Sequence, residues 1–514
     1  MSSNIFTNVK LYDGTGRTPF MADVAVKDEK IAAVAPCGTL NKTGHTVIDG
    51  KGLDLTPGFV DIHGHSDGKA VTVLSGDSKI SQGVTVEVTG NCGFSDYLDE
   101  VKDNDLGEAI HKVRGNFRAY ADLVERSHQA LNIVHMCGHN TLRAYVMGYE
   151  NRPPTGEEMR RMKELLADAL DNGAGGFSGG PYYLPGKFAD TEELKELASL
   201  LKGTGKPYAT HIRSEGDELL ESLAEAVEIA AAGDNNLQIS HLKAAPESNW
   251  HKIDAAFELI EKAQQTGMDI LADRYPYIHS NTSLRTVVPK PFDEVDTITL
   301  CTRLKESAQY RAELLAALND GIDRGYDRIL IMNSPEVSHR CWYGKSLVEI
   351  GKAKGISPQE VIVELLASGR CPGAAFGTMC EENLKKILAK PYVVAGSDGN
   401  IRSFDDNGTH PRAFGTHPGF FRIASKFSDA AAVIRRMTAL PAAKFNLTGR
   451  GVIAPGYYAD LVLVDLEHYD SHADYAVPNR RAEGVYAVYV NGAVSYSPDP
   501  EIKTFRTGKM LRIK

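Results

Sequence analysis

At both ends of the chain, apolar and polar residues alternate in short runs, and this pattern distinguishes the ends from the middle. The N-terminal runs are broken by Asp-Gly, Lys-Gly and Pro-Gly turns, as is typical of β-strands with tight connections. The C-terminal runs alternate in the same way, and Asn491-Gly492 is a hairpin signal. We therefore expect residues 1–56 and 441–514 to combine into one small β-sandwich domain.

Between residues 57 and 440, strand-like apolar runs alternate with segments of helical period, which is the pattern of βα units. In one unit, Asp190 has the position of a helix N-cap, and Glu193 completes a capping-box pattern. Leu194 and Leu197 then begin a helical stripe. Eight strand-like runs follow one another: GFVDIHGH, TVEVTGNCG, NIVHMCGHN, GAGGFSGG, KPYATHIRSE, LQISHLK, DILADRYPY and PYVVAGSDG. The pattern predicts an α/β fold, a (β/α)8 TIM barrel, with strand C-termini at the active-site mouth.

The spacing between the last two of these runs is unusually long. The seventh strand is expected to end near Asp273, and the eighth to start near Tyr392. This distance exceeds what one barrel helix needs. We therefore expect an inserted subdomain between strands seven and eight, over about 281–350, lying above the mouth of the barrel.

The composition is that of an ordinary globular protein and narrows the range of partners. The chain has 514 residues, 42% of them hydrophobic, and a formal net charge of −10. An acidic balance without a basic patch argues against nucleic acid and anionic membranes as partners. No apolar run approaches the roughly 20 residues of a membrane span, and the N-terminus has no signal-peptide pattern. Seven scattered cysteines without a CxxC pair indicate a reducing compartment, so we expect a cytoplasmic protein.

Metal-binding side chains stand at the ends of several predicted strands. Because strand C-termini meet at one mouth of a barrel, these side chains are expected to converge there. They are His63 and His65 after strand one, Cys92 after strand two, His211 after strand five, His241 after strand six and Asp398 after strand eight. Imidazole, thiolate and carboxylate are zinc ligands, and six donors exceed one tetrahedral ion. Two neighbouring metals, or one tight and one weak, fit better, and a cysteine thiolate could bridge them.

Each of these residues also has a purely structural alternative. A lone histidine at a strand end is more often a hydrogen-bonded structural residue, and a buried thiol such as Cys92 often only fills space. Asp398 could be a plain helix N-cap. However, His63 and His65 are two apart on a strand and therefore point to the same face. The agreement of six positions favours a metal site.

Several motifs resemble those of a known family. PGFVDIHGHSD looks like the opening of amidohydrolase-superfamily enzymes. GNCGFS, HIRSEGD, SHLKAA, DRYPY, GSDG and HPRAFGTHP together resemble its N-acyl-D-amino-acid deacylase (D-aminoacylase) branch, over about residues 5–495. The resemblance implies that Cys92, His211 and His241 hold a tight zinc ion. It further implies that His63 and His65 hold a weaker second ion and that Asp398 is the catalytic acid and base.

The same resemblance implies how a substrate carboxylate would be held. Arg412 is the expected partner, because a guanidinium matches a carboxylate with two hydrogen bonds, and Tyr275 could add a hydroxyl. His139 is a candidate pocket residue, with a structural role as an equal alternative. Asn281 and His417 replace a serine and a phenylalanine that are common in this branch, and both are expected near the substrate loops.

We therefore expect zinc-dependent hydrolysis of N-acyl-D-amino acids to a carboxylate and a free D-amino acid. Zinc would activate water, and Asp398 would pass its proton to the leaving amine. The alternatives are a dipeptidase, a cyclic-amide hydrolase such as a hydantoinase or dihydroorotase, and a non-catalytic scaffold. Hydantoinases rely on a carboxylated lysine, and no lysine ends strands three or four here. The sequence does not determine whether the chain forms a homo-oligomer. The preference for D-amino acids rests on the family resemblance.

Overall fold

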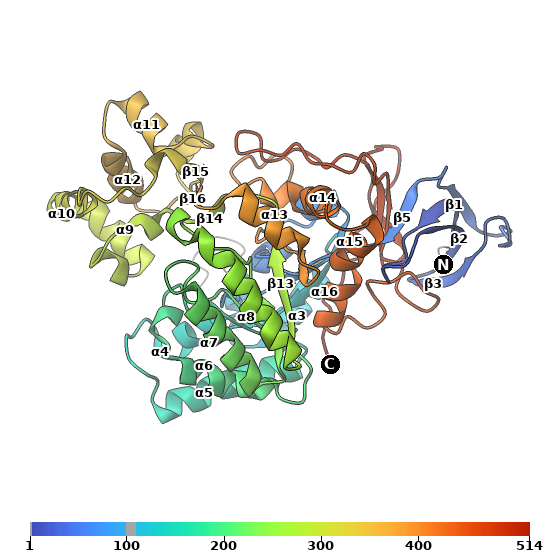
Figure 1. Cartoon of the computed structure of the whole chain (residues 1–514), viewed down its shortest axis with the longest axis horizontal. Helices are drawn as coiled ribbons and strands as arrows, with labels where there is room; N and C mark the ends of the chain where they lie inside the picture. Colours follow the sequence, from blue (N-terminus) through green and yellow to red (C-terminus); the bar gives the residue numbers. More distant parts are fainter. Residues whose placement is uncertain (1–2, 99–108) are drawn as a thin grey trace.

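The computed structural model describes residues 3–98 and 109–514, which form a barrel, a β-sheet domain and an inserted subdomain (Figure 1). The barrel strands follow in chain order: β6 (Phe59–Asp61), β7 (Val84–Thr89), β8 (Asn132–His135), β9 (Cys137–Gly138), β10 (Phe177–Gly179), β11 (Tyr208–Thr210), β12 (Asn236–Ile239), β13 (Asp269–Arg274) and β17 (Val393–Ala395). Each coincides with one of the eight expected runs, with the third run divided into β8 and β9. The expected TIM barrel is therefore confirmed.

The barrel is made of two hydrogen-bonded sheets, and it closes at the two places where these sheets meet. One sheet has the order β6-β7-β8, and the other has the order β9-β10-β11-β12-β13-β17. Met136 separates β8 from β9 within one barrel strand, and its amide donates to the Thr89 carbonyl at 3.0 Å. At the other side, Gly64 forms a parallel bridge with Gly399, beyond the ends of β6 and β17. The first and last barrel strands thus meet directly beside two of the expected metal ligands.

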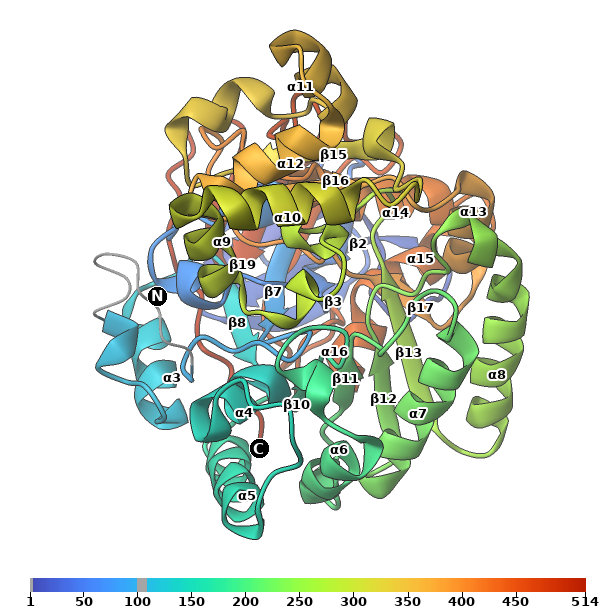
Figure 2. The ribbon, with the colours of Figure 1, turned by 90° about the vertical axis from the view of Figure 1, so that its left-hand side faces the viewer.

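Helices cover the outside of the barrel, as the βα pattern requires (Figures 1 and 2). They are α1 (Asp77–Ile80), α3 (Phe117–Arg126), α4 (His139–Met147), α5 (Gly156–Asp171), α6 (Thr191–Ala198), α7 (Leu219–Ala232), α8 (Ile253–Gln265), α13 (Glu381–Ala389), α14 (Arg412–Ala424), α15 (Ala430–Met437) and α16 (Ala439–Lys444). Asp190 caps α6 by accepting from the Glu193 amide at 2.8 Å. The Glu193 side chain instead pairs with His139 and Arg143, so the reciprocal half of the expected capping box is replaced by a buried ion pair.

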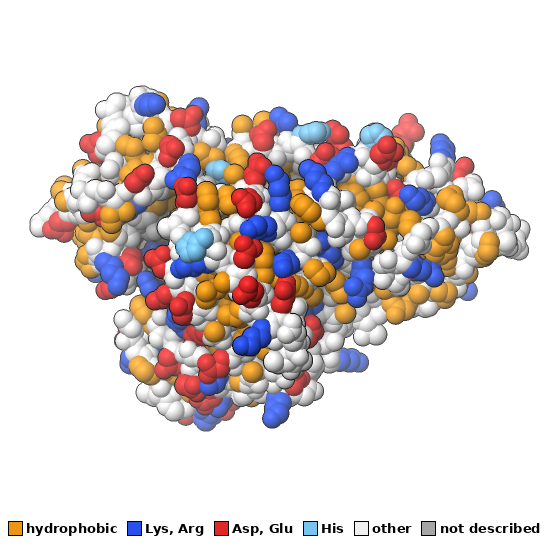
Figure 3. Space-filling view, in the orientation of Figure 1, with side chains coloured by type: hydrophobic (Ala, Val, Ile, Leu, Met, Phe, Trp, Pro, Cys, Tyr) orange, Lys and Arg blue, Asp and Glu red, His pale blue; other side chains and the backbone are white. Residues whose placement is uncertain are grey.

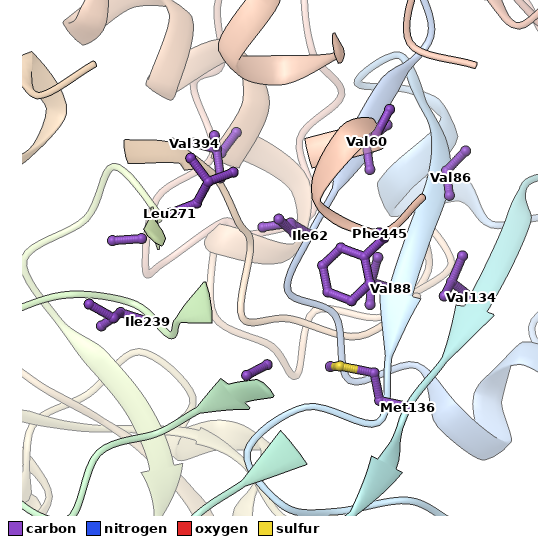
Figure 4. Packing of buried hydrophobic residues seen from close by; sticks show 14 of the residues in the cluster. Val60, Ile62, Val86, Val88, Val134, Met136, Ile239, Leu271, Val394 and Phe445 are labelled. Carbon is purple, nitrogen blue, oxygen red and sulfur yellow. The ribbon is translucent and has the colours of Figure 1, made fainter. Parts of the chain in front are cut away.

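Alternation along the strands places apolar side chains inside the barrel and several polar side chains against the surrounding helices. Val60 and Ile62 contribute to the buried apolar cluster, together with side chains of β7, β8, β12, β13 and β17 (Figure 4). Asp61 alternates with them and pairs with Lys79 on α1, and Glu87 of β7 contacts the same ammonium, so these carboxylates face the helices. The labelled side chains of Figure 4 point towards one another inside the ring of strands, so the interior of the barrel holds an apolar core.

The two chain ends form one continuous sheet rather than two separate sheets. Its strands are β1 (Ser3–Leu11), β2 (Phe20–Lys27), β3 (Lys30–Ala35), β4 (Thr46–Asp49), β5 (Asp54–Pro57), β18 (Leu461–Val464), β19 (Val485–Val490) and β20 (Ala493–Tyr496). Phe6 and Tyr489 pack edge to face at 4.9 Å across its core, although their strands are not neighbours. The sheet therefore curves around its own core, which corrects the expected sandwich.

The boundary expected at 441 also needs correction. Residue 441 lies inside α16, which packs against β6 of the barrel. Near the C-terminus, the Leu511 amide donates to the Ile133 carbonyl at 2.7 Å, so this end returns to β8. Val462 joins the barrel core, whereas its neighbour Leu461 joins the core of the sheet. The sheet is thus attached to the barrel along one of its faces.

The inserted subdomain lies over one end of the barrel in Figure 2 and extends beyond residue 350. Its elements are β14 (Ser280–Ser283), α9 (Thr297–Glu306), α10 (Ala308–Leu318), β15 (Ile329–Asn333), α11 (Leu347–Lys354), α12 (Pro358–Ala367) and β16 (Gly373–Phe376). The three strands pair in the order β14-β16-β15, and the helices enclose a separate apolar core. The expected limit of 350 was too early because the last strand returns to pair with the first.

On the face shown in Figure 3, acidic and basic side chains are interspersed, and neither sign of charge dominates a large area. Within residues 3–98 and 109–514, no helix is both long enough and apolar enough to cross a lipid bilayer.

Candidate active site

The six expected metal-binding side chains meet at the C-terminal mouth of the barrel. Donor atoms of Cys92, His211 and His241 lie within 4.8 Å of one another, and those of His63, His65, Cys92 and Asp398 do so as well. All are buried except His65, whose side chain is 26% exposed. The residues that the strand-end pattern predicted to converge therefore lie close together in the structure.

The first group has the separations of a tetrahedral site. Cys92 Sγ lies 3.7 Å from His241 Nε2 and 3.9 Å from His211 Nδ1. Ligands of one tetrahedral zinc ion lie roughly 3.6 Å apart when one is sulfur and the other nitrogen. Thiolate and imidazole are donors that zinc prefers, so this group fits a zinc ion with little rearrangement.

The second group shares Cys92 with the first. Asp398 Oδ1 lies 3.1 Å from His65 Nε2 and 3.6 Å from His63 Nε2, and His63 Nε2 lies 3.3 Å from Cys92 Sγ. A thiolate between two donor groups can bridge two ions. The geometry therefore accommodates one ion in the first group and a second ion beside it.

The electrostatics favour anionic donors. Burial opposes ionisation of Cys92, but the charge of His63 and hydrogen bonds from His211 and His241 hold the pKa of its thiol well below the ordinary value. Burial likewise opposes ionisation of Asp398, and the charges of Arg412 and His241 outweigh it, so that its pKa is well below the usual range. Both groups are thus prepared to bind a cation at neutral pH.

The mouth opens into a cavity of about 1370 Å³ whose lining includes His65, Cys92, Asp398 and Arg412. The inserted subdomain closes one side of this cavity through residues such as Asn281. The donor groups are therefore reachable by a small molecule, which is the arrangement expected of a catalytic metal site.

Comparison with known proteins agrees with this site. A model of the amidohydrolase family matches residues 46–496. The chain belongs to the amidohydrolase family. A D-aminoacylase from Alcaligenes xylosoxydans xylosoxydans is 33% identical over 504 residues, which are 94% of this chain and 92% of that protein.

Two solved structures are similar along the whole amidohydrolase chain. A D-aminoacylase, described through the role of its binuclear metal centre, has a TM-score of 0.82 and 32% identity, with 99% of each chain covered. The N-acyl-D-glutamate deacylase of Bordetella bronchiseptica, complexed with zinc and a phosphonate inhibitor, has a TM-score of 0.81 and 28% identity, again with 99% of each chain covered. The expected D-aminoacylase branch is thereby confirmed.

Three donors of this amidohydrolase sit on left-handed backbone. The φ angles of Cys92, His241 and Asp398 are 53°, 37° and 51°. Such angles are unfavourable for residues other than glycine and persist where the surroundings hold them. Close packing does so at Cys92, because a Cβ on Gly180 would lie 2.0 Å from the Cys92 carbonyl oxygen. The glycines of GNCG and FSGG therefore let two barrel loops touch at the metal site.

A layer of acidic residues behind the ligands orients them, and the sequence reasoning missed it. Asp273 lies 3.1 Å from His63 Nδ1 and accepts from the His241 amide at 2.9 Å. Glu215 lies 2.9 Å from His241 Nδ1 and also contacts the Lys243 ammonium. These contacts leave Nε2 of His63 and His241 free to face the metal position. Asp273 was detectable at the expected end of strand seven, and Glu215 lies within the motif HIRSEGD, of which only His211 was interpreted as a site residue.

Arg412 and Tyr275 lie together beside Asp398 in the amidohydrolase site. Arg412 begins α14 and is buried, and its guanidinium lies 5.0 Å from the centre of the Tyr275 ring. The Tyr275 hydroxyl is buried and has no hydrogen-bond partner among the described residues. Burial raises its pKa, but the charges of Lys243, Arg274 and Arg412 outweigh this and lower it. The hydroxyl therefore stands in a positively charged environment.

Two expectations about pocket residues were wrong. His139 is fully buried at the start of α4, lies 2.8 Å from Glu193 Oε1 and is not part of the cavity lining. Its role is the structural alternative. His417 lies flat against Phe59 at 6.0 Å, at the opposite end of β6 from the metal ligands, so it is remote from the substrate loops. Asn281, in contrast, lines the cavity, and its carbonyl accepts from Arg412 at 3.2 Å.

Proposed function

We propose that this amidohydrolase cleaves the amide bond of N-acyl-D-amino acids with the help of zinc, giving a carboxylate and a free D-amino acid. The observation that supports it most directly is the Cys92, His211 and His241 group, with Asp398 beside it, at the base of an open cavity. The relatives named D-aminoacylase and N-acyl-D-glutamate deacylase support the D-amino acid.

Cys92, His211 and His241 would hold the tight zinc ion, and His63 and His65 a weaker second ion. Bound zinc supplies Lewis acidity, which activates water at neutral pH and polarises the acyl carbonyl. Glu215 and Asp273 hold the imidazoles in the orientation that presents the unprotonated nitrogen. This division between two groups agrees with the shared position of Cys92.

Asp398 would be the acid and base of the reaction. Its low pKa makes it a carboxylate before reaction, so it can accept the proton of the attacking water. It then donates this proton to the leaving nitrogen as the amide bond breaks. Its position next to both His65 and the cavity places it within reach of both partners.

Arg412, Tyr275 and Lys243 would bind the carboxylate of the amino acid. Arg412 offers a planar donor, and the Tyr275 hydroxyl is a buried donor that lacks a partner among the described residues. The Lys243 ammonium, which also contacts Glu215, adds a positive charge that lowers the pKa of the Tyr275 hydroxyl. A buried hydroxyl in a positive environment is costly unless an anion satisfies it, which is why we assign the carboxylate here.

The alternatives are less consistent with the site. A cyclic-amide hydrolase would need a modified lysine among the ligands, whereas here a cysteine thiol occupies a shared position between the two donor groups. A scaffold would not need to keep six donors, five of them buried, close to one another. A dipeptidase acting on D-residues uses the same chemistry and differs only in the acyl group.

All seven cysteines are free thiols, which supports the reducing, cytoplasmic environment that we expect.

A panel of N-acetyl-D-amino acids and their N-acetyl-L counterparts, with zinc added, tests this function. Free amine should be released from D substrates and not from L substrates. The matched Asp398→Asn protein controls for contaminating hydrolases. Equal rates on both enantiomers, or activity that survives in Asp398→Asn, would contradict the proposal.

A further inference from the structure

The cavity has two chemically different sides. Asp398 follows β17, and Arg412 follows it on α14, so the charged side lies at the eighth barrel strand. The loop after β10, the fourth barrel strand, is diametrically opposite in the closed order of eight strands. There the lining includes Tyr182 and Tyr183, with Phe94 from the loop after β7. The donor groups lie between these two sides.

The aromatic side begins at a metal ligand and runs outwards. The Tyr183 and Tyr182 rings lie 4.8 and 5.1 Å from the His211 ring, and Phe94 lies 5.7 Å from Tyr183. Tyr182 is 42% exposed although it lines the cavity. Ile298, on α9 of the inserted subdomain, also lines the cavity and is 64% exposed. Large apolar groups left exposed around a cavity are a common sign of a ligand surface.

Three charged residues near this side have partners within the protein. Lys187 lies 3.4 Å from Asp293, and Arg213 lies 2.8 Å from Glu225. The Arg285 guanidinium donates to the Asp293 carbonyl at 3.0 Å. Lys187 and Arg213 are therefore paired within the protein and do not require a charged group of the ligand.

The direction of an N-acyl amino acid follows from these positions. Its carboxylate and its acyl chain leave the scissile amide on opposite sides. With the carboxylate at Arg412 and the carbonyl at the donor groups, the acyl chain points to the aromatic side. A cavity of about 1370 Å³ exceeds the roughly 300–1,000 Å³ of sites that enclose drug-sized ligands, and an N-acetyl amino acid is smaller still.

We propose that Phe94, Tyr182 and Tyr183 form an acyl subsite and that the preferred substrates carry an apolar acyl group larger than acetyl. This inference rests on the proposed function, because it takes the direction of the substrate from the carboxylate position. The apolar chain would cover the rings from His211 to the rim at Tyr182, which removes their exposed surface from water.

An acyl series on one D-amino acid tests the inference. The N-acetyl, N-butanoyl, N-hexanoyl and N-octanoyl derivatives are compared by kcat/KM, using the D-amino acid that is hydrolysed fastest as its N-acetyl derivative. We expect an increase of at least 10-fold from acetyl to octanoyl. Equal or falling values along the series would overturn the acyl subsite while leaving the hydrolase function intact.

A binding measurement separates the subsite from turnover. Calorimetric titration of the Asp398→Asn protein with the N-octanoyl and N-acetyl derivatives should give a Kd at least 10-fold lower for octanoyl. Both ligands share the carboxylate contact, so the difference reports the acyl group. Equal Kd values would overturn the subsite even if the chosen D-amino acid is turned over poorly.

A matched pair of tyrosine variants tests whether the preference for octanoyl over acetyl substrates depends on the aromatic side. Tyr182→Ser should reduce the octanoyl-to-acetyl ratio of kcat/KM at least 5-fold. Tyr486, on β19 of the sheet domain, is 50% exposed and serves as the control, so Tyr486→Ser should leave the ratio unchanged. A ratio that responds equally to both variants would assign the effect to something other than the aromatic side.

Discussion

Arg412 Nη1 lies 2.7 Å from Asp398 Oδ2, so the residue expected to bind the substrate carboxylate is paired with the residue expected to move the proton. The other carboxylate oxygen of Asp398 faces His65 at 3.1 Å. Asp398 therefore connects the donor groups to the positively charged side of the cavity. A substrate carboxylate that approaches Arg412 would share its guanidinium with Asp398 and come close to the reacting centre.

Asp398→Asn should abolish most turnover without unfolding the barrel. The amide keeps the shape of the side chain but cannot accept a proton, and positioned acid–base groups contribute roughly 10²–10⁴-fold to a rate. We expect kcat to fall by at least about 100-fold in an N-acetyl-D-amino acid assay. Asp405→Asn, at a neighbouring exposed position, is the control and should keep the normal rate.

Arg412→Ala should weaken substrates with a free carboxylate far more than their carboxamide analogues. A charge-assisted hydrogen bond contributes about 1.5–3 kcal/mol, which corresponds to about a 10- to 150-fold increase in KM. The measurement compares KM for acid and amide forms of one substrate. The same increase in KM for both forms would contradict a contact between Arg412 and the substrate carboxylate. Arg412 would then only hold Asp398.

Cys92→Ser should lose the tight metal ion. The native protein is expected to contain about one firmly held zinc ion per chain, and replacing a thiolate by a hydroxyl removes the softest donor of the site. Metal content after gel filtration, measured by inductively coupled plasma mass spectrometry, checks this. Cys380→Ser, remote from the donor groups, should retain zinc, and equal retention in the two variants would contradict the ligand assignment.

Lys79→Met should strongly destabilise the fold. The Lys79 ammonium is fully buried and lies 2.6 Å from Asp61 and 3.3 Å from Glu87, while it also donates to Ser397 at 2.6 Å. Removing one partner leaves buried carboxylates unpaired, which costs about 3–5 kcal/mol. Urea unfolding should show this loss, whereas Lys51→Met at an exposed turn should change the free energy of unfolding by less than about 0.5 kcal/mol.

His417→Phe should make stability less dependent on pH in mildly acidic solution. Burial lowers the pKa of His417 to about 4, so the folded state holds it neutral while the unfolded state protonates it near 6.5. The unfolded state thus binds more protons below 6.5, and stability falls as pH falls through the window from 6.5 to 4. From pH 7 to pH 5 this group accounts for a loss of about 2 kcal/mol.

The phenylalanine variant should lack this share of the loss, which urea titrations at pH 5 and pH 7 would measure. His251, which is exposed, provides the control, because His251→Phe should leave the pH dependence as it is. A wild-type stability that is flat from pH 7 to pH 5 would contradict the buried, neutral state of His417.

The sequence by itself determined the eight barrel strands and the donors at their ends. Strand-end positions could be read because side chains alternate along a strand and because parallel strands present their C-termini at one mouth. His63, His65 and Cys92 follow from this rule alone. Their convergence with His211, His241 and Asp398 did not require any knowledge of side-chain packing.

Tertiary structure decided whatever depends on partners from distant parts of the chain. The pairing of Arg412 with Asp398, the support of His63 by Asp273, and the burial of His139 against Glu193 are contacts across loops and helices. The end of the inserted subdomain was equally hidden, because β16 returns to β14 over a long stretch of sequence. Such contacts have no local period or spacing, since they arise only when the closed barrel brings separate segments to the same place.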